Sequence, residues 1–211
     1  LALSTLLKDE EQAEGQQALN NALTPHLNVS TSARQSIQSK LQSANIDSSI
    51  YVMCPGAEYG PSKRWPSEHF AALAKELIDA NPSNQIILIG SQGDRYLADE
   101  ITSQTNQNPN IYNWCGSTSL DEAIALIGMS KAVISNDSGL MHIAAALKVP
   151  QVAIFGSSDP AHTPPLSDKA KVIWLNLPCS PCHKRECPLG HLKCLKDILP
   201  EDVFQATQTL Y

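Results

Sequence analysis

Six short, mostly apolar runs, separated by loops and helical patterns, constrain the fold of this chain more than any other feature. The runs cover residues 50–54, 85–89, 111–114, 131–135, 151–155 and 171–175. Continuous runs of this length are typical of strands buried on both faces. Because strands that alternate with helices are joined by crossover connections, the sequence predicts an α/β fold with a doubly wound parallel sheet.

Amphipathic helical patterns lie between these runs and after the last of them. They cover residues 67–79, 95–103, 119–128, 138–147 and 200–210. Ser67, which precedes Glu68, is predicted to cap the first of these helices. Ser119, three residues before Glu122, has the spacing of a capping box.

The first 48 residues differ in composition and periodicity from the rest of the chain. They are polar and weakly periodic, with a short helix expected at 32–43 and little apolar material to bury. The chain starts at Leu1, so we expect residues 1–48 to be a linker and the end of a missing N-terminal domain. Residues 49–211 are expected to form one α/β domain with a cysteine-rich insert at 178–195.

The charge and hydropathy of the chain limit the kinds of partner that it can bind. Fifteen Lys and Arg against 21 Asp and Glu give a net charge of -6, so no overall field draws the chain to nucleic acid or to an anionic membrane. No stretch has the length and apolarity of a membrane span, and the opening residues lack the features of a signal peptide. A cytoplasmic protein is therefore expected.

Glycines locate the expected ligand. Five of them follow the ends of five predicted strands: Gly56, Gly90, Gly116, Gly139 and Gly156. The carboxyl ends of parallel strands share one edge, where ligands bind and where glycine lets the backbone approach a phosphate. Tight turns alone would also explain any single one of these glycines.

Neither common phosphate motif is present. The segment from Gly56 to Lys63 lacks the spacing of a P-loop, and the dinucleotide fingerprint G-x-G-x-x-G does not occur. Lys63 and Arg64 do precede a predicted helix start, which indicates either a diphosphate clamp or a pair of solvated surface charges.

A second cluster follows the fourth run, in the segment from Ser135 to His142. Asp137 or Ser138 is expected to cap a helix whose first free amides belong to Gly139 and its neighbours, with His142 one turn further along. This arrangement favours an anion site over an ordinary cap beside a core histidine. A Ser-His-Asp triad is disfavoured, because Asp137 is adjacent to Ser138 and cannot readily orient a histidine that also reaches that serine.

Four segments together resemble the ADP-heptose:lipopolysaccharide heptosyltransferases of glycosyltransferase family 9, and specifically the heptosyltransferase II type. They are CPGAEYGPSKRWP at 54–66, SNDSGLMHIAAAL at 135–147, FG at 155–156 and TPPL at 163–166. The resemblance implies a GT-B enzyme with two Rossmann-like domains, of which this chain is the C-terminal, donor-binding one. It implies transfer of L-glycero-D-manno-heptose from ADP-heptose to a heptose of the lipopolysaccharide inner core, without a catalytic cofactor.

The resemblance also assigns residues. It implies that Lys63 faces the donor phosphates, and that Asp137, Ser138, Gly139 and His142 hold the diphosphate and its sugar. The alignment of glycines at the strand ends adds Gly56 to the expected donor site. Thr118 and Gln92 fall where related enzymes contact the nucleoside. The general base is expected in the N-terminal domain, which would be this chain's partner, and the enzyme is expected at the inner face of the inner membrane. A GT-B transferase that uses another nucleotide-sugar remains an alternative.

Four cysteines crowd into one segment with the spacing C-x2-C-x4-C-x6-C: Cys179, Cys182, Cys187 and Cys194. Four thiolates this close can surround one Zn²⁺, so they are candidate ligands of a structural zinc, although reduced thiols and disulfides are also consistent with the spacing. A zinc-knuckle nucleic-acid module is the rival function of another class. The net charge of -6 and the low aromatic content, 5%, disfavour it.

Overall fold

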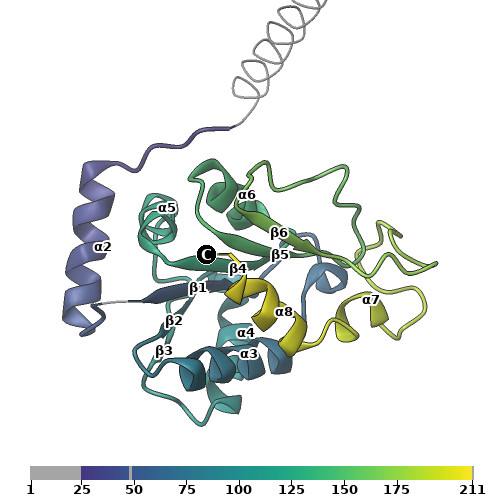
Figure 1. Cartoon of the computed structure of the whole chain (residues 1–211), viewed down its shortest axis with the longest axis horizontal. Helices are drawn as coiled ribbons and strands as arrows, with labels where there is room; N and C mark the ends of the chain where they lie inside the picture. The colour runs from purple at the N-terminus through teal and green to yellow at the C-terminus, as the bar shows by residue number, and fades with distance from the viewer. Residues whose placement is uncertain (1–24, 48, 211) are drawn as a thin grey trace, which may run out of the picture.

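The sheet has six strands, all parallel, in the order β3-β2-β1-β4-β5-β6 (Figure 1). The structure is a computed structural model that describes residues 25–47 and 49–210. Its strands are β1 (Ile50–Cys54), β2 (Gln85–Leu88), β3 (Ile111–Asn113), β4 (Ala132–Asn136), β5 (Gln151–Ile154) and β6 (Ala170–Ile173). Each bound lies within two residues of the predicted run, so the doubly wound parallel sheet is confirmed.

The chain enters this sheet at its centre. Val52 of β1 lies opposite Ile87 of β2 on one side and opposite Val133 of β4 on the other. From β1 the chain builds outward to β3 and then returns to place β4 beside β1. A reversal of this kind leaves a crevice at the carboxyl ends of the two central strands, where ligands of such folds bind.

Helices cover both faces of the sheet (Figure 1). One layer consists of α3 (Ser67–Ala80), α4 (Arg95–Gln104) and α8 (Pro200–Gln208), and the other of α2 (Thr31–Ser43), α5 (Leu120–Met129) and α6 (Gly139–Ala146). Side chains of β1 alternate between the layers: Tyr51 and Met53 belong to the first core, Val52 and Cys54 to the second. The chain also forms three short helical segments, η1 (Pro61–Lys63), η2 (Gln92–Asp94) and α7 (Lys193–Lys196).

Of the caps predicted for α3 and α5, the second is confirmed and the first is wrong. Ser119 and Glu122 form the capping box: the Glu122 N–H donates to Ser119 Oγ at 3.2 Å and the Ser119 N–H to Glu122 Oε2 at 2.9 Å. Ser67 does not cap α3, because Pro66 occupies the cap position and Ser67 is the first helical residue. Its hydroxyl donates instead to Glu100 of α4, at 2.9 Å, so it joins two helices of one layer.

The helix expected at 32–43 is present as α2, but it buries more than the sequence predicts. Ala33, Ile37 and Leu41 are buried in the second core. Two side chains of α2 also reach the carboxylate of Glu122: Ser36 Oγ donates at 2.6 Å and Lys40 Nζ at 2.9 Å. The described part of the expected linker therefore packs on the domain, while residues 1–24 of it lie outside the described residues.

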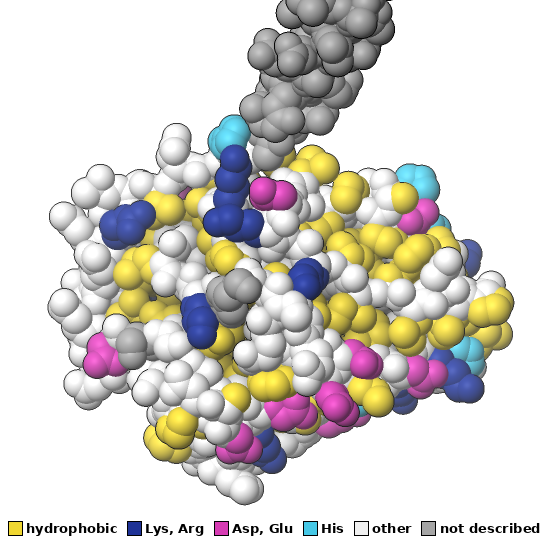
Figure 2. Space-filling model, in the orientation of Figure 1, with side chains coloured by type: hydrophobic (Ala, Val, Ile, Leu, Met, Phe, Trp, Pro, Cys, Tyr) yellow, Lys and Arg dark blue, Asp and Glu magenta, His cyan; other side chains and the backbone are white. Residues whose placement is uncertain are grey.

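The surface carries no concentrated positive charge on the face seen in Figure 2. Lys and Arg side chains there lie apart from one another, among neutral and apolar side chains. Within residues 25–47 and 49–210, no helix has the length and apolarity to cross a membrane.

We predict that Glu122→Gln loosens α2 from α5 and lowers the free energy of unfolding by about 1 kcal/mol at pH 7. Hydrogen bonds from Ser36, Lys40 and the Ser119 N–H lower the pKa of Glu122 from 4.5 to about 2. Because the folded-state pKa lies below the unfolded one, the stabilisation is complete above pH about 4.5 and is lost as the pH falls toward 2. Urea unfolding of both proteins should therefore show a smaller difference at pH 3 than at pH 7.

The matched control is Asp121→Asn, which removes a carboxylate from the same helical turn. Asp121 is exposed and makes no side-chain hydrogen bond to another described residue. A difference for Glu122→Gln that is no larger than for this control, or that grows on acidification, would contradict the predicted tie between α2 and α5.

Candidate functional site

A pocket of about 340 Å³ lies at the carboxyl ends of β1, β2 and β4, where the fold places its crevice. Three of the five glycines, Gly56, Gly90 and Gly139, line it. The other lining residues are Ala57, Glu58, Ile89, Ser91, Asp94, Thr118, Ser119, Leu120, Ala123, Ser138, Leu140 and Ile143. Thr118 is thus placed in the pocket as expected. Gly116 and Gly156 also follow strands but do not line it, and Gly156 is packed against Leu195.

Asp94 explains why two of these positions are glycine. A Cβ added at Gly56 would lie 2.3 Å from Asp94 Cγ, and one added at Gly90 would lie 3.0 Å from Asp94 Cβ. The Asp94 carboxylate is fixed by Ser91, whose N–H and Oγ donate to Oδ2 at 2.9 and 2.6 Å. Neither Ser91 nor Asp94 is among the site residues predicted from the sequence. Their spacing after Gly90 is that of a capping box and could have indicated them.

The start of α6 forms one wall of the pocket. Ser138 occupies the cap position in extended backbone, but neither its side chain nor that of Asp137 caps the helix; Ser138 Oγ lies 3.2 Å from Ser135 Oγ instead. The expected side-chain cap is therefore wrong. A Cβ added at Gly139 would meet no described atom within 4 Å, so the backbone is open on that side. Uncapped amides at a helix start attract an anion.

Asp137 is held by residues from two other loops. Lys63 Nζ and Ser158 Oγ both lie 2.5 Å from its Oδ2. The side chain of Asp137 is 4% exposed and that of Lys63 17%. Lys63 is thus not a solvated surface charge. Its partner Asp137 directly precedes Ser138, the cap residue of α6, so the ammonium lies close to the start of that helix.

Arg64, the second predicted cation, contacts the loop after β1 and α4. Its Nε and Nη2 donate to the carbonyl of Ala57 at 3.2 and 3.1 Å, and its Nη1 donates to the hydroxyl of Tyr96 at 2.7 Å. The guanidinium therefore braces the loop after β1. Of the two cations predicted to clamp a diphosphate, Lys63 lies beside the start of α6 and Arg64 contacts the loop after β1, and the clamp itself stays a prediction.

Lys63 also lines a second, smaller pocket of about 140 Å³. The other lining residues are Tyr59, Ser158, Asp159, His162, Thr163 and His183. Ser138 lines the first pocket, and the preceding residue, Asp137, contacts two residues of the second. The two pockets therefore flank the start of α6.

Three predicted donor-site residues do not line either pocket, namely Gln92, Asp137 and His142, although Asp137 contacts two residues of the smaller one. The exposed His142 makes no hydrogen bond to a described residue. Gln92 lies over the loop after β3, since a Cβ at Gly116 would be 2.1 Å from its Oε1. The residues of α6 that line the larger pocket are Gly139, Leu140 and Ile143, so the exposed side chain of His142 is directed elsewhere.

Asn136 joins the two central strands beside the site. Its Nδ2 donates to the carbonyl of Pro55 at 2.8 Å, and its Oδ1 accepts from the Trp65 N–H at 3.0 Å. The side chain is fully buried. It therefore fixes the loop that carries Gly56 relative to the end of β4.

The cysteines fall into two groups, and all six are free thiols. Cys54 and Cys115 lie in the core, where burial raises the pKa of Cys115 to about 12 and the pKa of Cys54 further still. Cys179, Cys182, Cys187 and Cys194 all border one cavity of about 20 Å³. As placed in the described residues, no three His, Cys, Asp or Glu side chains are arranged to hold a metal ion together.

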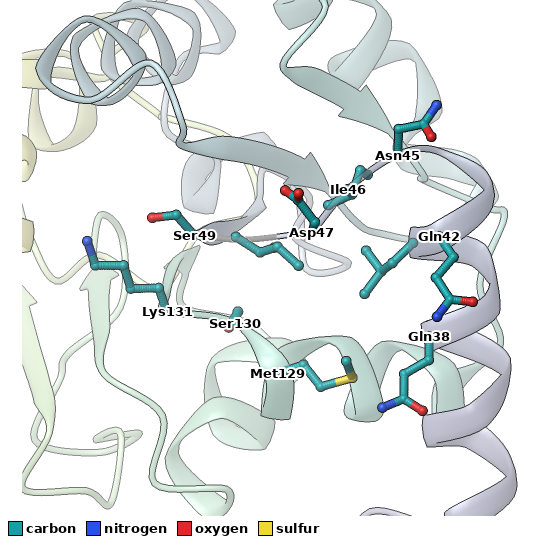
Figure 3. Close-up of a pocket in the computed structure, with 11 residues that line it drawn as sticks. Gln38, Gln42, Asn45, Ile46, Asp47, Ser49, Met129, Ser130 and Lys131 are labelled. Atoms are coloured by element: carbon teal, nitrogen blue, oxygen red, sulfur yellow. The ribbon is translucent and has the colours of Figure 1, made fainter.

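A larger pocket, about 1050 Å³, lies at the opposite edge of the sheet, near the amino ends of β1 and β4 (Figure 3). Gln38, Gln42 and Asn45 line it from α2 and the turn that follows, and Met129, Ser130 and Lys131 from the end of α5 and beyond. It lacks glycine loops and helix starts. Because ligands of doubly wound sheets bind at the carboxyl ends, the smaller pocket is the candidate site.

Comparison with known proteins gives a consistent assignment. Lipopolysaccharide heptosyltransferase 2 of Salmonella typhimurium is 41% identical over 190 residues, which cover 89% of this chain and 54% of that protein. The enzyme of the same name from Escherichia coli K12 is 45% identical over 159 residues, covering 74% of this chain and 45% of its own length. The chain spans about half the length of these curated relatives.

A solved structure agrees with the sequence relatives. The structure of E. coli ADP-heptose lps heptosyltransferase II matches with a TM-score of 0.74 at 40% identity, over 88% of this chain and 53% of that one. The expected Rossmann-like, GT-B type of fold is thereby confirmed. The pattern of glycosyltransferase family 9 (heptosyltransferase) matches residues 11–193. The chain therefore belongs to glycosyltransferase family 9.

Proposed function

We propose that this chain binds the donor in a heptosyltransferase, which transfers L-glycero-D-manno-heptose from ADP-heptose to a heptose of the lipopolysaccharide inner core. The observation that carries the proposal is the uncapped start of α6, placed between two pockets and beside Lys63. The identity of 41% and 45% to two lipopolysaccharide heptosyltransferases supports the choice of substrate.

The two pockets suit the parts of a nucleotide-sugar. The larger one combines aliphatic side chains, Ile89, Leu120 and Ile143, with the polar groups of Thr118 and Asp94, a combination that fits a base and the hydroxyls of a ribose. Only Oδ2 of Asp94 receives the hydrogen bonds from Ser91, so Oδ1 is left to accept from a ligand hydroxyl. In this proposal the diphosphate crosses the start of α6, and the sugar extends past Lys63 toward the smaller pocket.

The chemistry requires stabilisation of the leaving group. An acceptor hydroxyl oxygen attacks the anomeric carbon, the bond from that carbon to the diphosphate oxygen breaks, and its electron pair stays on ADP. The hydroxyl proton goes to a general base. Amides at the α6 start and the Lys63 ammonium would stabilise the charge that grows on the departing oxygen.

Asp137 is compatible with this role of Lys63. An ammonium carries three donors, and one suffices for the contact with Asp137. The carboxylate would therefore act as a positioning group that aims the ammonium at the diphosphate. Ser158, bound to the same Oδ2, would restrict the carboxylate in turn.

The remaining parts of the reaction are assigned to the rest of the enzyme. We propose that the general base and the acceptor surface belong to a facing N-terminal domain, in the part of the relatives' length that this chain does not match. Heptosyltransferases as a class need no catalytic cofactor. The proposed location is the cytoplasm, at the inner face of the inner membrane, where the acceptor would be met.

Two alternatives differ in their ligand. A transferase of the same fold could take another nucleotide-sugar, because the pocket composition by itself does not select adenine. A nucleic-acid module would require a basic surface, whereas the net charge is -6 and the face in Figure 2 shows only scattered Lys and Arg.

We predict that ADP binds to the wild-type chain and that Lys63→Ala weakens this binding roughly ten- to hundredfold, about 1.5 to 3 kcal/mol, through loss of a charge-assisted contact. Isothermal titration calorimetry with ADP, UDP and GDP measures both affinity and nucleotide preference. Tighter binding of UDP or GDP would favour the alternative transferase. Equal affinity of both proteins for ADP would remove Lys63 from the site.

Two controls separate binding from folding. Lys63→Ala leaves the buried Asp137 without its cation and should lower the free energy of unfolding by roughly 3 kcal/mol, of which the double variant Lys63→Ala/Asp137→Asn should recover a part. The double variant should still bind ADP weakly. Lys75→Ala removes an exposed cation of α3 outside both pockets and should bind ADP like the wild type.

We also predict that this chain alone binds the donor but does not transfer heptose. Without a facing wall of the cleft, water reaches the anomeric carbon, so at most slow donor hydrolysis is expected. The measurement is mass spectrometry of the product after incubation with ADP-heptose and a heptosylated inner-core acceptor. The full-length E. coli relative serves as the positive control. Efficient transfer by the 211 residues would place the general base within them, with Asp137 and His142 the first candidates.

A further inference from the structure

The loop between β6 and α7, residues 174–192, contains neither helix nor strand. Loops of this length in a compact domain are uncommon without a function or a cross-link of their own. None of its apolar side chains is fully buried: Trp174, Leu177 and Leu192 are half-buried, and Leu189 is 61% exposed. Hydrophobic burial alone therefore accounts poorly for its defined path.

Four cysteines from this loop and α7 share one cavity. Cys179, Cys182 and Cys187 are half-buried and Cys194 is buried, and all four border a space of about 20 Å³, which holds about one water-sized body. No Asp or Glu lines this cavity. The lining is thus dominated by sulfur, which is the donor type that Zn²⁺ and iron prefer.

The backbone after Cys187 turns back so that an amide faces the sulfur of that residue. Gly190, at φ +70°, turns the chain so that its N–H donates to the Cys187 carbonyl at 3.0 Å. Two residues later the Leu192 N–H donates to Cys187 Sγ at 3.4 Å. An amide aimed at sulfur stabilises a thiolate, the form of cysteine that binds metal.

We propose that Cys179, Cys182, Cys187 and Cys194 bind one thiophilic divalent metal ion, Zn²⁺ or Fe²⁺, through four thiolates. The described side chains border the cavity without converging as a ligand set, so binding requires the thiols to rotate inward about their Cα–Cβ bonds. Four thiols release four protons to solvent, and the site then carries a charge of minus two. The basic residues Lys184, Arg185, Lys193 and Lys196 lie in the same segment and offset this charge.

The metal loop would also position the proposed donor site, an extension that rests on the proposed function. The loop carbonyls of Lys184 and Arg185 accept from Ser62, whose N–H lies 3.2 Å from the latter. The His183 N–H donates to the Ser157 carbonyl at 2.8 Å. Ser62 and Ser157 directly precede Lys63 and Ser158, the two residues that hold Asp137.

The test starts with the wild-type chain, prepared without chelator from cells supplied with zinc and iron. Elemental analysis should give about one metal ion per chain. Measuring zinc and iron in the same sample shows which of the two is bound. Replacement by Co²⁺ should produce the sulfur-to-cobalt charge transfer and the intense visible bands of a tetrahedral thiolate site. These readouts need no ADP, so they stand even if the proposed function fails.

Variants then assign the ligands. Cys182→Ser and Cys187→Ser should lose the bound metal, while the matched control Cys115→Ala, a core thiol outside the cluster, should keep about one ion. The wild-type cobalt spectrum keeps the proposal testable if a variant does not fold. A metal-free wild type that shows no thiolate spectrum with one equivalent of Co²⁺, or disulfides detected by mass, would overturn the proposal.

The positioning role has its own readout. Removal of the metal by a chelator should weaken ADP binding several-fold, and restoring one equivalent of the same ion should recover it. Unchanged ADP affinity of a metal-free, folded chain would overturn the positioning role and leave the metal site as a purely structural one.

Discussion

The geometry of the candidate site depends on one buried amide. Asn136 ends β4 and binds both the Pro55 carbonyl after β1 and the Trp65 N–H before α3. An unpaired amide at this depth would cost about 1 to 3 kcal/mol per lost partner, so the two loops are held at a fixed separation. Trp65 transmits the constraint further, because its indole N–H donates to the Ile198 carbonyl at 2.9 Å and so joins the loop to the C-terminal segment. The crevice is thus fixed by hydrogen bonds across the point where the strand order reverses.

The electrostatics of this crevice act at short range. The chain has a net charge of -6, and Lys63 is paired with Asp137, so the diphosphate of the proposed donor would meet little long-range attraction. In the proposed function its stabilisation would come from groups in contact with it, the α6 amides and the donors of Lys63 that do not bind Asp137. Such a site would select among anionic ligands by their geometry more than by their charge. A ligand that cannot reach the start of α6 gains little from the Lys63–Asp137 pair, whose charges cancel.

The sequence predicts the local features well and the long-range contacts poorly. Strand bounds, the Ser119 capping box and the glycines at one edge follow from periodicity and spacing, which depend on neighbouring residues. The contact of Lys63 with Asp137 joins positions 74 apart, and that of Ser158 with Asp137 joins positions 21 apart, so neither has a local signal. Ser67 is not a cap because Pro66 occupies that position, and its hydroxyl binds a partner that has no local signal, Glu100, 33 residues away. Similarly, the polar composition of α2 hid three buried side chains, because one narrow stripe suffices to pack a helix.

Two serines connect the crevice with the cysteine segment. Ser62 Oγ lies 3.0 Å from Ser157 Oγ inside the protein, and each serine also contacts the loop that contains His183, Lys184 and Arg185. Both serines border the cavity of the four thiols. A displacement of that loop must therefore move either these buried hydrogen bonds or the backbone that carries Lys63 and Ser158. Since breaking buried hydrogen bonds is costly, the loop and the Lys63–Asp137 pair are mechanically coupled, and whatever fixes the cysteines also limits the freedom of the ammonium group.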